Sequence, residues 1–162
     1  MNKPKHLPRY GVGPFYVAGI TALTVLGLSL EQKGMLTSGS IPQLRLPFQI
    51  AAVILMLFGT YIWCAAIFGK KIGDDIRSNT LATTGIYAHV RNPIYSGIAI
   101  TLTGVLLLAH NLWLLLLLPP VFWAAMTVLM ICTEEKWLTK LYGDEYIAYC
   151  KKVNRCIPWF SR

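Results

Sequence analysis

The chain has 162 residues, of which 55% are hydrophobic and only 14% are charged, so it is far more apolar than a soluble domain of this size. Its net charge of +8 at pH 7 comes from basic residues that form no long or organised segment, which argues against nucleic-acid binding. We therefore predict an all-α integral membrane protein that forms a single domain over residues 1–162 and has the lipid bilayer as its partner.

Four apolar runs approach the roughly 20 residues that a bilayer core requires. The first follows basic residues, as a signal peptide would, but it is about twice as long as the usual apolar region and no small-residue cleavage site follows it. We predict a retained helix. The third run is short, and it can cross the bilayer only if its helix starts earlier, with Asn92 as the cap and Pro93 in the first turn. The predicted transmembrane helices are residues 11–30, 48–68, 92–109 and 112–131.

The third and fourth predicted helices are joined by His110 and Asn111 alone, so they must form a tight antiparallel hairpin. This hairpin returns the segment 134–158, which follows the fourth helix, to the membrane face where the segment 79–97 ends. Two polar segments that are far apart in the sequence thereby become neighbours in space. We predict that both belong to one site.

Two features inside the hairpin affect how closely its helices can be approached. Gly97, Thr101 and Gly104 fall on one face of the third helix, where another helix or a ligand can come close to the backbone. Pro119 and Pro120 remove two backbone donors from the fourth helix, which predicts a kink.

Basic residues are distributed unequally among the segments between the helices. Three precede the first helix, four lie between the second and third and six follow the fourth, whereas only two lie between the first and second. The positive-inside rule therefore predicts a multi-pass protein with both termini and the middle loop in the cytoplasm. Affinity for anionic lipid headgroups accompanies this distribution.

The chain after the fourth helix predicts a cytoplasmic tail of two short amphipathic helices, broken at Gly143, with Tyr146 and Tyr149 directed toward the membrane or the hairpin. Glu134 and Glu135 would stand at the end of the fourth helix, where the helix dipole is unfavourable to anions. A cationic ligand would explain their presence there.

Other candidate motifs give no site. The start Gly11-Val12-Gly13-Pro14 is not a nucleotide-binding loop, because no strand precedes it. The cysteines form no C-x-x-C pair and the histidines lie in different segments, so we predict no metal site and assign these residues no role. They are Cys64, Cys132, Cys150, Cys156, His6, His89 and His110.

Two motifs carry a resemblance to a known family. The chain reads G-x-Y-x-x-x-R-N-P-x-Y-x-G from Gly85 to Gly97, and E-E-x-x-L-x-x-x-Y-G-x-x-Y-x-x-Y from Glu134 to Tyr149, followed by a basic-V-x-R-x-I-P ending at Pro158. In order, spacing and membrane context it resembles the isoprenylcysteine carboxyl methyltransferase and phospholipid methyltransferase family.

This resemblance implies S-adenosylmethionine bound at the cytoplasmic face between the two motifs, and methyl transfer to a lipophilic small molecule or lipid. A carboxylate such as Glu134 pairs with the cofactor ammonium, while Asn92, Tyr95 or Arg91 donates to its carboxylate. Catalysis then depends on alignment and the exclusion of water. By resemblance the catalytic residues are Arg91, Tyr95 and Glu134, and the cofactor-binding residues are Asn79, Thr80, Leu81, Ala82, Tyr87, Asn92, Pro93, Tyr95, Glu134 and Glu135.

Two departures from the family pattern concern the acceptor. Asn92 stands where the prenylcysteine enzymes have His, so a histidine base is not assumed. Met130 stands where the eukaryotic enzymes have an Arg for the substrate carboxylate, and no Lys or Arg lies between Arg91 and Lys136. An amine headgroup, a thiol or an isoprenoid-derived acceptor is therefore at least as suitable as a prenylcysteine carboxylate.

Two alternatives stay open from the sequence. Sterol-reductase-like membrane oxidoreductases share related C-terminal motifs, but they bind NADPH, whose 2′-phosphate calls for an arginine cluster that this chain lacks. The chain can also be a non-catalytic membrane subunit whose polar segments only pack the hairpin.

Overall fold

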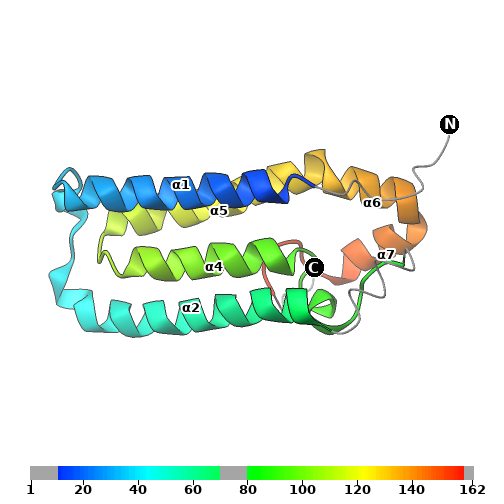
Figure 1. The fold of residues 1–162 in the computed structure, drawn as a ribbon, viewed down its shortest axis with the longest axis horizontal. Helices are drawn as coiled ribbons and strands as arrows, with labels where there is room; N and C mark the ends of the chain where they lie inside the picture. The colour runs from blue at the N-terminus through cyan, green and yellow to red at the C-terminus, as the bar shows by residue number, and fades with distance from the viewer. Residues whose placement is uncertain (1–10, 70–79, 159–162) are drawn as a thin grey trace.

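The computed structural model of the chain describes residues 11–69 and 80–158. Over these residues all regular secondary structure is helical, apart from one isolated bridge between Ser40 and Asn111. The all-α prediction is confirmed for this part of the chain. The long helices run side by side (Figure 1) and are α1 (Gly13–Gln32), α2 (Arg45–Phe68), α4 (Pro93–Leu107) and α5 (Leu112–Cys132).

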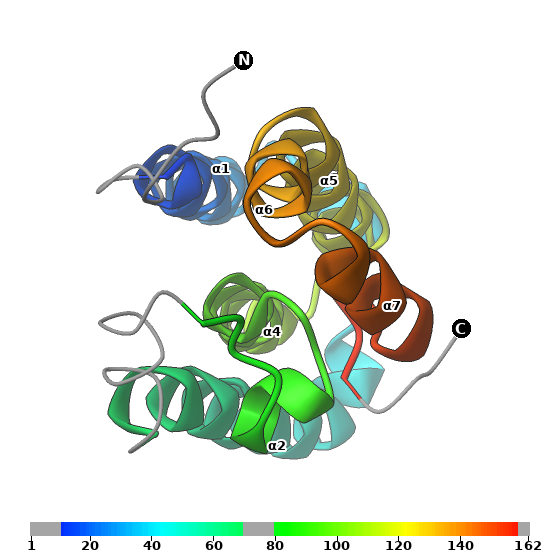
Figure 2. The ribbon, with the colours of Figure 1, turned by 90° about the vertical axis from the view of Figure 1, so that its right-hand side faces the viewer.

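Shorter helices connect and extend this bundle. Two 3₁₀ turns lie between α1 and α2, a third precedes α4, and two short α-helices follow α5. Seen from the end of the bundle, α6 continues near α5 while α7 turns back toward α4 (Figure 2). These elements are η1 (Thr37–Gly39), η2 (Pro42–Leu44), η3 (Gly85–Ala88), α6 (Glu134–Tyr142) and α7 (Asp144–Lys152).

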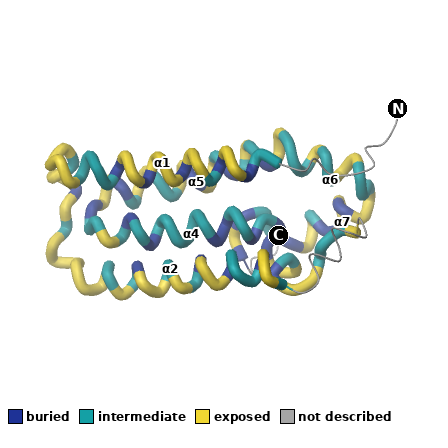
Figure 3. Tube along the Cα trace, viewed as in Figure 1, coloured by how far each residue is buried: buried dark blue, intermediate teal, exposed yellow. Residues whose placement is uncertain are grey.

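Three stretches of the described chain are long and apolar enough to cross a bilayer: α1, Pro42–Phe68 and Leu112–Tyr142. Helix α4 has only 15 residues, or about 22 Å at 1.5 Å per residue, against a hydrocarbon core of about 30 Å. A fourth span therefore stays a prediction. The outer faces of the bundle are exposed (Figure 3) and carry large apolar side chains such as Leu57 and Phe15, which suits lipid rather than water.

The start of α4 differs from the prediction in how it is capped. Pro93 is the first helical residue, as expected, but the Asn92 side chain makes no capping hydrogen bond. Its Nδ2 atom donates instead to the Arg155 carbonyl, at 3.0 Å. The helix also ends at Leu107 rather than at residue 109. The capping prediction is wrong because the side chain is oriented by this tertiary contact with the C-terminal segment, and its oxygen accepts no hydrogen bond from the first turn of α4.

The small-residue face of α4 packs against α2. A Cβ atom added at Gly97 would lie 2.7 Å from the Gly59 carbonyl oxygen, and one added at Gly59 would lie 2.5 Å from the Gly97 carbonyl oxygen. Gly104 is similarly close to the Ala52 carbonyl. Of the two alternatives that the sequence left open at this face, a helix rather than a ligand occupies it.

The α4–α5 hairpin is confirmed and is held at its turn by Asn111, which is fully buried. Its side chain accepts a hydrogen bond from the Trp113 amide at 3.0 Å and donates to the Leu36 carbonyl at 2.7 Å. These contacts join the hairpin turn to the α1–α2 connection. Helix α5 then continues through Pro119 and Pro120 to Cys132.

The chain breaks its helical path at Thr133, whose φ and ψ are −128° and −82°. Glu134 and Glu135 therefore lie in the first turn of α6, not at the end of the fourth helix. The expectation of an unfavourable dipole is wrong, because the N-terminus of a helix favours anions. Glycine at position 143, with φ of 59°, separates α6 from α7 as predicted.

Candidate functional site

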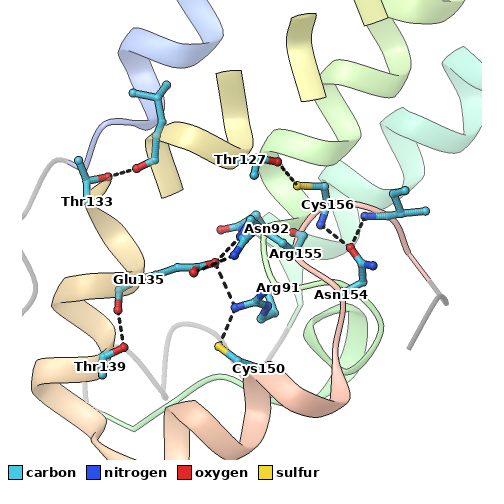
Figure 4. Close-up of polar contacts among 12 residues, drawn as sticks. Arg91, Asn92, Thr127, Thr133, Glu135, Thr139, Cys150, Asn154, Arg155 and Cys156 are labelled. Atoms are coloured by element: carbon cyan, nitrogen blue, oxygen red, sulfur yellow. Dashed lines mark hydrogen bonds and ion pairs between the residues drawn. The ribbon is translucent and has the colours of Figure 1, made fainter. Parts of the chain in front are cut away.

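Three segments meet at the end of the bundle that carries α6 and α7. They are the loop before α4, the start of α6 and the C-terminal segment 153–158 (Figures 2 and 4). Backbone contact holds two of them together, because the Arg91 amide donates to the Asn154 carbonyl at 2.9 Å. The hairpin thus brings the two polar motifs to one place, as the sequence predicted.

The first polar group of the site is Glu134 with Tyr95. The Tyr95 hydroxyl donates to Glu134 Oε1 at 3.1 Å. The Tyr95 and Tyr16 rings also pack in a T-shaped arrangement, with a centroid distance of 5.8 Å. Tyr16 is anchored in turn by a hydrogen bond from its hydroxyl to the Phe122 carbonyl. The Tyr95 side chain is therefore held from two sides.

Tyr87 lies close enough to this pair to be influenced by its charge. Burial raises the pKa of Tyr87 to about 12, and the negative charge of Glu134 adds to the shift. The phenol accordingly stays protonated at neutral pH and can act as a donor but not as a base. The backbone carbonyl of Tyr87 accepts a hydrogen bond from the Tyr149 hydroxyl at 2.5 Å.

The second polar group is centred on Glu135, which pairs with two arginines (Figure 4). Its Oε1 atom lies 3.1 Å from Arg91 Nη1, and its two oxygens accept from Arg155 Nε and Nη2 at 2.5 and 3.0 Å. Arg91 also donates to Cys150 Sγ, at 2.6 Å. This network fastens the start of α6 to the loop before α4 and to the C-terminal segment, and pairing with Glu135 raises the pKa of Arg155.

The two neighbouring glutamates therefore differ in what they can still bind. Glu135 already accepts from both guanidinium groups, whereas the hydrogen bond described for Glu134 comes from Tyr95 alone. An ionised carboxylate has about four acceptor positions, so Glu134 has capacity left for a cation. Arg91 Nε is buried without a hydrogen-bond partner among the described residues, which leaves one donor for an anion.

The sequence-predicted upstream segment packs next to α6 and α7. Leu81 belongs to an apolar cluster with Tyr146, Tyr149 and Val153. The Thr80 carbonyl accepts from the Tyr142 hydroxyl at 3.4 Å, and Ala82 is half-buried. Asn79 lies outside the described residues.

Gly11 and Gly13 contact the site although sequence reasoning gave them no role. A Cβ atom at Gly11 would lie 2.6 Å from Glu134 Oε1, and one at Gly13 would overlap the Tyr95 hydroxyl. These glycines had no predicted role, because no strand precedes them to form a nucleotide-binding loop, and their contacts with α4 and α6 depend on tertiary packing. The only signal in the sequence was a pair of glycines directly before an apolar run.

An apolar cleft of about 190 Å³ lies between α4, α5 and the C-terminal segment. Ser96 lines it, and the Ser96 hydroxyl is buried without a hydrogen-bond partner among the described residues. Cys156, whose thiol lies 3.7 Å from Thr127 Oγ1, forms part of its wall. Trp123, which is about half-exposed, also lines the cleft.

Residues 11–69 and 80–158 contain no cluster of three or more potential metal ligands.

Known proteins share sequence similarity with this chain. The phospholipid methyltransferase family model matches residues 46–145, more than half of the chain. Over 118 residues the chain is 34% identical to the protein-S-isoprenylcysteine O-methyltransferase of Schizosaccharomyces pombe, covering 68% of this chain and 50% of that protein. Over 109 residues it is 31% identical to methanethiol S-methyltransferase 1 of Bradyrhizobium diazoefficiens, covering 64% and 33%. The chain thus spans half or less of these relatives, and no solved structure matches it significantly.

Proposed function

The chain belongs to the phospholipid methyltransferase family, and from this we propose that it transfers a methyl group from S-adenosylmethionine to a lipophilic acceptor at the cytoplasmic membrane face. The observation that carries the proposal is the difference between the two glutamates. Glu135 is neutralised by Arg91 and Arg155, whereas Glu134 keeps acceptor capacity beside Tyr95. A carboxylate of this kind is suited to the α-ammonium group of the cofactor.

The other groups of the site suit the rest of the cofactor. Arg91 Nε, buried and unpartnered among the described residues, is the candidate donor for the cofactor carboxylate. Asn92 uses Nδ2 to bind the Arg155 carbonyl and keeps a second N–H for the same purpose. When bound, S-adenosylmethionine supplies an electrophilic methyl group on a sulfonium sulfur. The protein's contribution is then to align the two reactants and to exclude water.

The cleft between α4 and α5 is the proposed place for the apolar part of the acceptor. It borders α4 and the C-terminal segment, both of which also contribute to the polar site. Its lining is predominantly apolar, with Phe122, Trp123 and Met126 among its residues. A lipophilic molecule entering from the bilayer would therefore transfer from one apolar environment to another, with the Ser96 hydroxyl available to a polar atom.

The charges of the site favour a thiol or an amine as the acceptor over a carboxylate. Arg91 and Arg155 are both paired with Glu135, so a carboxylate would compete with an existing ion pair. Met130, at the position of the arginine expected in the prenylcysteine enzymes, is fully buried. The two curated relatives are named for different acceptors, an isoprenylcysteine and methanethiol, so the acceptor of this chain is decided by its own site.

Cofactor titration tests the proposal. The purified protein should bind S-adenosylhomocysteine, and Glu134→Gln should weaken this binding at least about tenfold, because a lost hydrogen bond to a charged group costs roughly 1.5 to 3 kcal/mol. Glu145→Gln, in the first turn of α7, is the matched control and should leave the affinity unchanged. An affinity for Glu134→Gln within about threefold of the unmodified protein would remove Glu134 from the cofactor site. Binding of NADPH instead would favour a sterol-reductase-like oxidoreductase. If the protein binds neither compound, a non-catalytic membrane subunit is favoured.

A further inference from the structure

The N-terminus of α1 touches the proposed cofactor site, although α1 lies outside the residues that match the family model. Gly11 faces Glu134 and Gly13 faces Tyr95, the two members of the hydrogen-bonded pair. The two glycines come from one short segment and contact two side chains that are 39 residues apart. These contacts arise only from the tertiary packing of α1 and cannot be read from the sequence.

A side chain at either of these two positions would require a neighbouring group to move. An added Cβ at Gly11 would come 2.6 Å from Glu134 Oε1, and one at Gly13 would overlap three atoms of the Tyr95 phenol. Separations under about 3 Å between such atoms require one group to move. Glycine therefore serves here to let the backbone approach closely, rather than for its conformational freedom.

The neighbours of Gly13 cannot yield easily. Tyr95 is held between the Tyr16 ring and Glu134. Tyr16 stands one turn after Gly13 on the same helix and is fixed to α5 through the Phe122 carbonyl. Because both α1 and the Tyr95 ring are anchored through Tyr16, a methyl group at Gly13 must displace the Tyr95 hydroxyl. At Gly11 only the flexible end of the Glu134 side chain has to move.

We propose that Gly11 and Gly13 are positioning residues, which hold the Tyr95 hydroxyl on the Glu134 carboxylate so that this carboxylate is oriented for the cofactor. Helix α1 thereby forms a wall of the site, in addition to the segments matched by the family model. The inference rests on the proposed function, because it assigns Glu134 to cofactor binding. It also predicts that small substitutions at these two glycines affect cofactor affinity more than they affect folding.

The test compares three alanine substitutions in α1 and the segment before it. Gly13→Ala should weaken S-adenosylhomocysteine binding at least about tenfold in calorimetric titration, the loss expected when a hydrogen bond to a charged group is broken. Gly11→Ala should weaken it by a smaller factor. Gly19→Ala is the matched control, since nothing lies within 4 Å of its added Cβ, and it should bind within about twofold of the unmodified protein.

A double-variant comparison separates positioning from a general packing role. If Gly13 acts through the Tyr95 hydroxyl, Gly13→Ala should cause little further loss of affinity in a Tyr95→Phe background. Equal losses in both backgrounds would overturn the inference, as would unchanged affinity for a folded Gly13→Ala protein. If Gly13→Ala does not fold, Gly11→Ala decides, and full affinity in that variant would overturn the inference. A failure of the unmodified protein to bind S-adenosylhomocysteine would overturn the proposed function and this inference together, whereas normal binding with insensitive glycine variants would overturn the inference alone.

Discussion

Replacing Glu135 by Gln should destabilise the protein strongly. Glu135 is the acidic partner of Arg91, whose side chain is 3% exposed, and of Arg155, whose side chain is 13% exposed. Removing one member of a buried ion pair costs about 3–5 kcal/mol, because the remaining charge stays buried without compensation. This is a large share of a typical stability of about 5–15 kcal/mol, and it corresponds to a fall in the unfolding midpoint on the order of 10 °C.

Thermal unfolding in detergent measures this effect, and a second substitution identifies its cause. The double variant Glu135→Gln, Arg91→Met removes both buried charges and should recover part of the lost stability. Glu134→Gln, one residue away, should leave the unfolding midpoint nearly unchanged while it weakens cofactor binding. A Glu135→Gln protein within about 1 kcal/mol of the unmodified protein, or a double variant less stable than either single one, would refute the assignment of Glu135 to the buried network.

Three further predictions address packing, topology and acceptor. Gly59→Ala should destabilise the α2–α4 contact by about 1–3 kcal/mol in thermal unfolding, because its Cβ would lie 2.5 Å from the Gly97 carbonyl oxygen, and a loss no greater than that of Gly19→Ala would contradict the close contact. In a cysteine-free background, an impermeant thiol reagent should label Ser38→Cys from outside intact cells but reach Lys140→Cys only after permeabilisation, and the reverse pattern would invert the orientation. With labelled cofactor, the protein should methylate an apolar thiol or amine but form no base-labile methyl ester on a farnesylcysteine analogue. Ester formation at rates near 1 per second, within the ordinary enzyme range, would show that Arg91 or Arg155 leaves Glu135 to hold the carboxylate.

Local patterns in the sequence were sufficient for the helices and for the meeting of the two polar motifs. Long continuous apolar runs predict helices, because a helix satisfies every backbone hydrogen bond within the segment, as lipid requires. The short connection at His110 and Asn111 forced a hairpin, and the hairpin brought Glu134 to the end of the bundle that holds Tyr95. Each of these steps depends on neighbours in the chain or on connection length.

The roles of individual side chains depended on contacts that the sequence does not encode locally. Glu134 and Glu135 are adjacent and identical in type, yet the helix rotation that follows the break at Thr133 directs one to Tyr95 and the other to two arginines. The capping of α4 was mispredicted because the Asn92 side chain is oriented by its donation to a carbonyl 63 residues away, and it caps nothing. The contacts of Gly11 and Gly13 arise only when α1 packs against α4 and α5. Spacing along the chain sets which residues share a membrane face, whereas the relative rotation and packing of whole helices set which atoms touch.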